Sequence, residues 1–219
     1  NNLQLTKERV QSLHDEAAEI CAGITGIRTA AAKKLSAEIR QALEDLNFGQ
    51  VRFDIEVRQT CNITPDGADE AEFMISVNPG EDLRPLAKIA SGGELSRIML
   101  GIKSVLANKD DTDTLIFDEI DTGISGRTAQ KVSEKMALIA RSHQVICITH
   151  LPQIAAMADI HFLIEKNIKD GFTTTSINRL SDQEIITELA RMLGGSQITD
   201  LVMDNAAQMK EFADNLKKQ

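Results

Sequence analysis

Apolar residues recur every three or four positions between Leu3 and Leu46, which is the period of a long amphipathic helix. The early steps alternate between three and four, as in the seam of a left-handed coiled coil, and the later steps of four unwind the supercoil. Two interpretations stay open, one strand of a coiled-coil arm or an amphipathic helix packed on a globular core. Gly23 and Gly26 weaken this helix, so a local break is expected there.

Two segments of alternating apolar and polar residues follow the helix. Asn47-Phe48-Gly49 has the chemistry of a helix stop. Residues 51–57 and 73–77 then alternate with the period of half-buried strands. Thr64-Pro65-Asp66-Gly67 supplies turn residues between them. The pattern predicts a β-hairpin or meander with a long connection.

From Ser91 onward, helical patterns alternate with short apolar runs. The pattern predicts helices at 98–106, 128–140, 185–193 and 198–216, and strands at 114–117, 145–148, 160–164 and 173–177. The strands at 114–117 and 145–148 are predicted to be buried on both faces. Such alternation favours an α/β domain with a largely parallel sheet flanked by helices. We therefore place an arm helix at 1–47 and a head lobe at 48–219.

Two glycines stand where one of these helices is expected to begin, in Ser91-Gly92-Gly93-Glu94. Glycine allows the backbone to approach a ligand closely, and a helix N-terminus offers free N–H groups to an anion. The run is therefore a candidate phosphate site to which Ser91 would add its hydroxyl. The alternative is an ordinary loop in which Ser91 caps the helix.

The apolar run at 114–117 leads directly into Asp118 and Glu119. In open α/β sheets, ligands bind at the carboxyl ends of the strands. An Asp in that place can hold Mg²⁺, and the Glu beside it can polarise an attacking water. This is a Walker B arrangement, and the alternative is a pair of solvated acids.

The next apolar run ends in Thr149 and His150. A His at the end of a neighbouring strand would lie near the same phosphate and hydrogen-bond it, although a lone His is more often structural. The order of the three motifs decides between these interpretations. A glycine-led helix, a Walker B strand and a strand ending in His resemble the C-terminal half of an ABC-type ATPase head.

Composition narrows the choice of partners. The net charge of -9 argues against a broad DNA-binding surface but leaves room for a local basic patch near Lys33 and Lys34. Aromatic residues make up 3% with no Trp or Tyr, which disfavours a platform for stacked bases. The three cysteines lack metal-binding spacing and suit reduced thiols in the cytoplasm. No run is apolar enough to span a membrane, and the chain does not begin like a signal peptide.

The runs around the three motifs resemble the bacterial RecN family, which belongs to the SMC-like branch of the ABC-type ATPases. The matching runs are 86–97, 117–126 and 149–155, and the resemblance covers roughly residues 80–200. Transporter ATPases usually carry Pro after the Walker B Glu, where this chain has Ile120.

The resemblance implies a cytoplasmic, nucleoid-associated ATPase of double-strand-break repair that uses ATP and Mg²⁺ and acts on DNA. This chain would be the C-terminal lobe of the head, joined to an N-terminal P-loop lobe, with 1–47 as the returning half of a coiled-coil arm. Two copies of the head would sandwich ATP. The residues on the phosphate of the opposite head would be Ser91, Gly92, Gly93 and Glu94. Those serving the head's own nucleotide would be Asp118 for Mg²⁺, Glu119 for water and His150 for the γ-phosphate.

Two features depart from the general ABC pattern. No Gly-x-x-x-x-Gly-Lys-Ser/Thr sequence occurs in the chain, so we expect the chain alone to bind ATP poorly and turn it over negligibly. Ser125 stands where many relatives of the superfamily have a loop Asp. Whether Asp121 takes over that role is open at this point.

Three functions compete. The leading one is ATP hydrolysis that closes and opens paired heads on DNA, and the second is an SMC-like scaffold or cohesion module whose assembly ATP controls. The third is a transporter ATPase subunit, which the helical lead-in disfavours. The chain opens inside a helical pattern, as an excised fragment would, and the residues before Asn1 would separate the first two functions.

Overall fold

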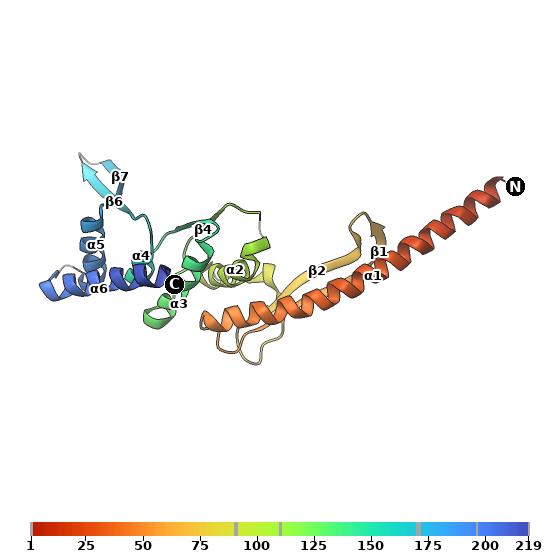
Figure 1. Cartoon of the computed structure of the whole chain (residues 1–219), viewed down its shortest axis with the longest axis horizontal. Coiled ribbons are helices and arrows are strands. Elements are labelled where there is room, and N and C mark those ends of the chain that lie inside the picture. The colour runs from red at the N-terminus through yellow and green to blue at the C-terminus, as the bar shows by residue number, and fades with distance from the viewer. Residues whose placement is uncertain (1, 90–91, 110, 170–171, 196, 219) are drawn as a thin grey trace. The chain divides into compact units, whose positions relative to one another are not determined.

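The computed structural model describes residues 2–89, 92–109, 111–169, 172–195 and 197–218. The chain divides into two compact units, residues 1–90 and residues 91–219. The first unit contains a long helix and an antiparallel sheet, and the second contains helices around short strands. The α/β class predicted from the sequence is confirmed (Figure 1).

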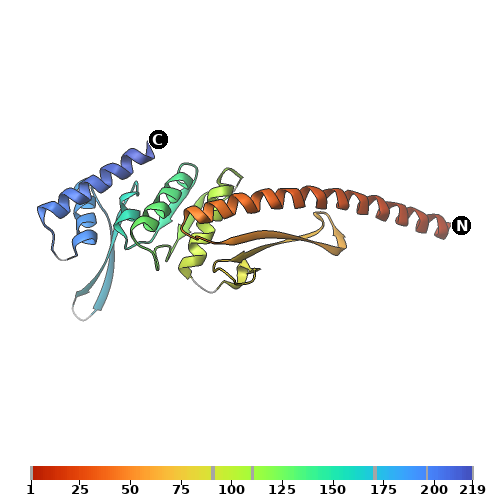
Figure 2. The same cartoon turned by 90° about the horizontal axis from the view of Figure 1, so that it is seen from below.

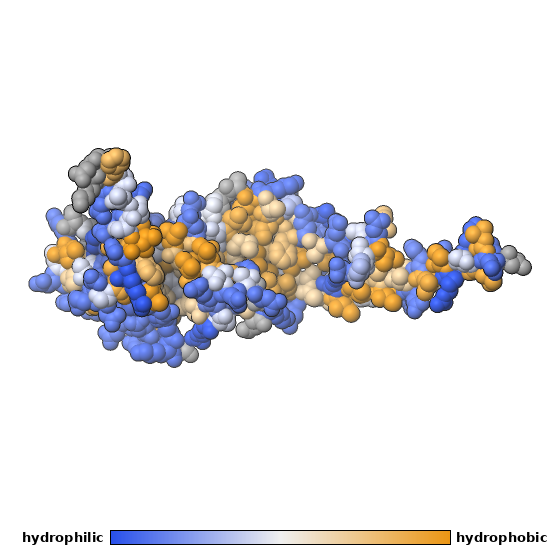
Figure 3. All heavy atoms as spheres, turned by 90° about the horizontal axis from the view of Figure 1, so that it is seen from above, coloured by the Kyte–Doolittle hydropathy of each residue, from blue (hydrophilic) through white to orange (hydrophobic). Residues whose placement is uncertain are grey.

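Helix α1, Asn2–Asp45, is continuous, so Gly23 and Gly26 do not break it. Its N-terminal half exposes large apolar side chains, namely Leu3, Leu5, Val10, Leu13, Ile20 and Ile27. Figure 3 shows hydrophobic surface interspersed with hydrophilic surface along this part of the molecule. Buried side chains begin at Cys21 and include Ile39 and Leu43. The second half of the helix is therefore packed, as the globular interpretation expects. The exposed seam of the first half leaves the coiled-coil interpretation a prediction.

The predicted stop at the end of α1 is confirmed. Asn47 adopts the left-handed conformation with φ of 70°, which Asn tolerates better than most residues. The Phe48 N–H donates to the carbonyl oxygen of Leu43 at 3.1 Å. This bond satisfies one of the carbonyl groups that a helix end leaves without a partner.

A long antiparallel hairpin lies along α1 (Figures 1 and 2). It consists of β1, Arg52–Thr64, and β2, Gly67–Ser76, and the short strand β3, Arg84–Pro85, pairs with β2 before the 3₁₀ turn η1, Leu86–Lys88. Thr64 pairs with Gly67, so the prediction of a long connection is wrong. Polar residues assigned to that connection pair as strand, Arg58 with Glu70 and Gln59 with Asp69, before the register shifts between Gln59 and Thr64.

Asp69 joins the hairpin to the helix. Its side chain is 2% exposed, and it accepts hydrogen bonds from Thr25 Oγ1 at 2.7 Å and from Arg28 Nη1 at 3.3 Å. Arg28 also donates to the Asp66 carbonyl oxygen at 2.7 Å. These contacts explain why the first compact unit runs to Ala90, whereas the sequence placed a boundary after residue 47. The functional division into arm and head stays a prediction.

The second unit begins with α2, Gly92–Leu106, and the turn η2, Ala107–Lys109. Strands β4, Thr114–Phe117, and β5, Gln144–Cys147, then pair in parallel, with α3, Gly126–Ile139, as the crossover between them. The order of helix and strand agrees with the prediction. Within the described ranges, the parallel sheet consists of these two strands and is smaller than expected.

The next two strands form a separate antiparallel sheet. These are β6, Phe162–Lys169, and β7, Phe172–Arg179. The strands predicted at 160–164 and 173–177 are therefore present, as an antiparallel pair outside the β4–β5 sheet. The physical reason is the short connection between them, because parallel neighbours need a crossover of about a dozen residues or more.

Strands β4 and β5 bury one face and expose the other. Leu115 and Phe117 are 8% and 5% exposed, whereas Ile116 is 67% and Ile146 is 45% exposed. The prediction that these strands are buried on both faces is therefore wrong for this chain. Parallel sheets in folded domains are almost always covered on both faces, so the exposed face is open to a further segment.

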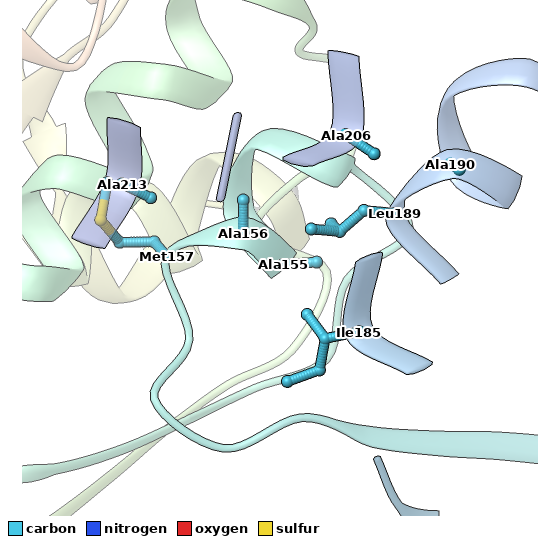
Figure 4. Close-up of a cluster of buried hydrophobic side chains, with 8 residues drawn as sticks. All are labelled: Ala155, Ala156, Met157, Ile185, Leu189, Ala190, Ala206 and Ala213. Atoms are coloured by element: carbon cyan, nitrogen blue, oxygen red, sulfur yellow. The ribbon is translucent and has the colours of Figure 1, made fainter. Parts of the chain in front are cut away.

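Three helices that follow β5 in the chain enclose a small core: α4, Pro152–Ala156, α5, Asp182–Gly194, and α6, Asp200–Lys217. Leu189, which is fully buried, packs among small side chains of α4 and α6 (Figure 4). Lys210 of α6 donates to the carbonyl oxygens of Ala156 and Ala158 at 3.2 and 3.0 Å. This core therefore fixes α4, the helix that follows His150. No helix within the described ranges has the length and apolar character that crossing a bilayer requires.

Replacing Leu189 by Ala should lower the free energy of unfolding by about 2–5 kcal/mol, because the cavity cannot be refilled by its small neighbours. Thermal or urea unfolding followed by circular dichroism measures the change. The matched control is Leu201→Ala, since Leu201 of α6 is 78% exposed. The control should stay within about 0.5 kcal/mol of the unmodified chain. Equal losses for the two variants would refute this assignment of the core.

Candidate functional site

The ends of β4 and β5 lie side by side. Phe117 is paired with Cys147, and the Ile148 N–H donates to the Phe117 carbonyl oxygen at 3.0 Å. Asp118 and Glu119 follow β4 directly, and His150 follows β5 after two residues. The structure therefore brings the candidate metal ligand, the candidate base and the candidate phosphate-binding His to one edge of the sheet. Their chemical roles stay predictions.

A buried carboxylate connects the two strand ends. Asp121 is 4% exposed, and its Oδ2 accepts hydrogen bonds from Thr149 Oγ1 at 2.6 Å and from the His150 backbone N–H at 2.8 Å. The ring Nδ1 of His150 lies 2.9 Å from the same oxygen. A buried charge is tolerated when it is hydrogen-bonded in this way. Asp121 is therefore committed to its own chain, which argues against an outward role like that of the ABC loop Asp.

Glu119 has an unusual backbone conformation. Its φ of 56° lies in the left-handed region, which is costly for a residue other than Gly and is concentrated at functional sites. The Glu119 N–H donates to Asp118 Oδ1 at 2.8 Å, which stabilises the sharp turn after β4. Both carboxylates are exposed.

The two glycines at the start of α2 lie against the loop that follows β4. A Cβ at Gly92 would collide with Glu119 Oε2. A Cβ at Gly93 would lie 2.9 Å from both the Glu119 carbonyl oxygen and Thr122 Cβ. The sequence suggested that these glycines serve a ligand. The structure adds a packing reason at Gly93, where a side chain would meet the backbone of the loop, whereas the Glu119 side chain can move away from one at Gly92.

Ser96 and Arg97 hold the same loop one turn further along α2. Ser96 Oγ donates to the Asp118 carbonyl oxygen at 2.8 Å. Arg97 Nη1 donates to the Thr122 carbonyl oxygen at 2.8 Å and to that of Ile120 at 3.4 Å. Burial lowers the pKa of the Arg97 guanidinium from its ordinary value, and Glu94 opposes that shift. Neither residue could be given a role from the sequence, because both donate to backbone carbonyl groups, which no residue type marks.

The other residues predicted for the site lie at the start of α2 and after β5. Gly92 is exposed at the first residue of α2, and Glu94 is half-buried in its first turn. Ser91 lies outside the described residues, so its predicted role as helix cap or phosphate ligand has no geometry here. The His150 side chain is 73% exposed. The α2 start and the two strand ends therefore form one open site on the second unit.

The site fits a metal ion that is shared with phosphate groups. Within the described residues, no group of three or more His, Cys, Asp or Glu side chains is arranged to hold a metal. Mg²⁺ typically needs only one or two carboxylates when phosphates and water complete its coordination. The exposed Asp118 at the strand end is a donor of this kind.

Cys147 lies beside the site, but its thiol has low reactivity. Burial raises the pKa of its thiol to about 12, and the negative charges of Asp121 and Asp118 act in the same direction. Cys61 of the hairpin is exposed. Because the thiolate is the reactive form, a raised pKa keeps a thiol neutral and unreactive at every pH well below it.

At about pH 8, iodoacetamide should alkylate Cys61 much faster than Cys147, because thiolate at Cys147 accumulates only as the pH approaches its pKa of about 12. Peptide mapping by mass spectrometry measures the two rates. In a Cys61→Ser variant, Cys147 should stay unmodified over the same time. Alkylation of Cys147 at the rate of Cys61 would show that its thiol is not suppressed.

Two solved structures share the fold of this chain. The Smc head domain of Pyrococcus yayanosii with a coiled coil and joint aligns with 86% of this chain and 35% of its own at a TM-score of 0.53 and 20% identity. The Smc head domain of Pyrococcus furiosus with an extended coiled coil, bound to the C-terminal domain of ScpA, aligns with 87% of this chain and 47% of its own, again at a TM-score of 0.53 and 20% identity. At this identity the likeness concerns the fold alone, and it confirms the SMC-type ATPase fold. The chain matches no protein-family model.

Curated relatives are much closer in sequence. The DNA repair protein RecN of Bacillus subtilis strain 168 is 42% identical over 99% of this chain and 40% of its own length. The RecN of Vibrio cholerae is 45% identical over 81% of this chain, and that of Streptomyces coelicolor is 36% identical over 95%. The chain thus spans 32–40% of the length of these relatives. With such identity over most of its residues, this chain belongs to the RecN family.

Proposed function

We propose that this chain is the C-terminal lobe of the head of a DNA double-strand-break repair ATPase, in which ATP bound between two heads controls their engagement on DNA. The observation that carries the proposal is the meeting of Asp118, Glu119 and His150 with the start of α2 at one edge of the sheet. Ligand sites in α/β sheets lie at such edges. The curated relatives are DNA repair proteins, which supports the biological setting.

Each strand end has its own task on the nucleotide of its own head. Asp118 holds Mg²⁺, which neutralises charge on the β- and γ-phosphates when it is bound. Glu119 polarises the attacking water, and its carboxylate lies beside Gly92 at the start of α2. The exposed ring of His150 hydrogen-bonds the γ-phosphate. These assignments follow from position and from the chemistry of the side chains.

The start of α2 serves a nucleotide that is bound mainly by a second copy of the head. Free N–H groups at a helix N-terminus attract phosphate, and Gly92 leaves this end open to solvent. Ser91, Gly93 and Glu94 flank that position. Because each copy supplies one half of the contacts, binding of ATP selects the paired state of the heads.

The exposed face of β4 and β5 is the place where we expect the P-loop lobe of the same protein to pack. Ile116, Ile146 and Ile148 are 67%, 45% and 52% exposed on these strands and the residue that follows them. Covering this face would bury apolar area and complete the sheet. It would also bring a P-loop, which this chain lacks, to the strand ends.

In a full-length RecN protein that carries this chain, Glu119→Gln should slow ATP turnover by about 10²- to 10⁴-fold, because water activation is lost. ATP binding and nucleotide-dependent pairing should persist. A coupled ATPase assay measures turnover, and a labelled nucleotide measures binding. Glu211→Gln, at an exposed position of α6, is the matched control and should leave turnover unchanged. Near-normal turnover of Glu119→Gln would remove Glu119 from the role of base.

Replacing Ser91 by Arg should block head pairing, because a long cation would fill the space intended for the partner's phosphate. Light scattering in the presence of ATP, in the Glu119→Gln background, measures the paired fraction. Ser142→Arg, placed before β5 at the opposite edge of the sheet, should leave pairing intact. Unchanged pairing of Ser91→Arg would refute the contact between copies.

A further inference from the structure

We propose that Asp121 is the positioning residue of His150, holding the imidazole with a proton on Nδ1 and directing Nε2 towards the nucleotide phosphate. The inference rests on the proposed role of His150 and deepens it. It assigns a task to a carboxylate that the sequence left without one.

The hydrogen bonds to Asp121 require the proton on Nδ1. Thr149 Oγ1 and the His150 backbone N–H both donate to Oδ2, at 2.6 and 2.8 Å. The ring Nδ1 is 2.9 Å from the same oxygen. An ionised carboxylate only accepts hydrogen bonds, so the ring nitrogen that faces it must be the donor. In the neutral ring, Nε2 then carries the lone pair.

Asp121 and His150 differ in solvent exposure, as the positioning of one by the other requires. The Asp121 side chain is 5% exposed and the His150 side chain is 73% exposed. The ring is therefore anchored at one nitrogen and open at the other. Solvent or a ligand reaches Nε2 without disturbing the buried bond.

The surroundings keep Asp121 in place from both sides. Arg97 donates to the carbonyl oxygens of Ile120 and Thr122, which flank Asp121 in the chain. Thr149, which donates to Asp121, also accepts a hydrogen bond from the Leu151 N–H at 3.0 Å, just before α4 begins. A group that must act within a fraction of an ångström needs such support from rigid elements.

The same arrangement suits the ring once a phosphate is bound. A phosphate oxygen only accepts hydrogen bonds, so Nε2 must then carry a proton, which the ring takes up from solvent. The resulting imidazolium would lie between two anions, the Asp121 carboxylate and the phosphate. A buried Asp beside a His orients the ring and stabilises its charged form in this way in other enzymes.

Imidazole nitrogen NMR on this chain, recorded with the rings in their neutral form, tests the geometry directly. A His150→Gln variant identifies the signals of His150 among those of the four His residues. We expect the neutral His150 ring to carry its proton on Nδ1, whereas free imidazole side chains favour Nε2. Asp121→Ala should return the ring to the Nε2 form, and Thr149→Val, which removes a different donor to Asp121, should not. A native ring protonated on Nε2 overturns the proposal, even if Asp121→Ala fails to fold.

ATP turnover by the full-length protein tests whether the positioning of His150 by Asp121 matters for hydrolysis. Asp121→Ala should lower kcat by about 100-fold with little change in KM, because the ring is misplaced rather than ATP released. The loss should match that of His150→Ala, and the double variant should lose no more, since the two residues act as a unit. If His150→Ala leaves kcat unchanged, the proposed function of His150 fails, and the NMR result still decides the tautomer. If His150→Ala slows turnover and Asp121→Ala does not, the positioning role alone is refuted.

Discussion

A single buried carboxylate holds the site together. Asp121 follows β4, and it accepts hydrogen bonds from the residues that follow β5, so two strand ends are joined through one oxygen atom. Leaving such a group without its partners would cost about 1–3 kcal/mol or more, which is why the loop and the neighbouring turn adopt their shapes together. The exposed acids and the exposed imidazole are placed by this interior bond.

The glycines of α2 make the second half of the same arrangement. Because Gly93 lacks a side chain, the helix lies close to the loop backbone, and Arg97 of the same helix donates to the loop's carbonyl oxygens. A movement of the loop after β4 would therefore also displace the start of α2 and His150.

The sequence predicted where the helices and strands lie better than it predicted which of their faces are buried and how they pair. Helical and alternating periods located α1, the strands and the motif residues, since each element carries its own period. The burial of β4 was mispredicted because an apolar strand looks the same whether its second face is covered by this chain or by another segment. The pairing of β6 with β7 depends on the length of their connection. Asp121 was named but left without a role, because its partners lie 28 and 29 residues away.

The most direct test is a structure of the full-length Glu119→Gln protein with ATP and Mg²⁺. The account predicts that His150 Nε2 of one head and the N–H groups at the start of α2 of a second head lie within hydrogen-bonding distance of the same γ-phosphate. A nucleotide whose γ-phosphate contacts neither group would contradict it.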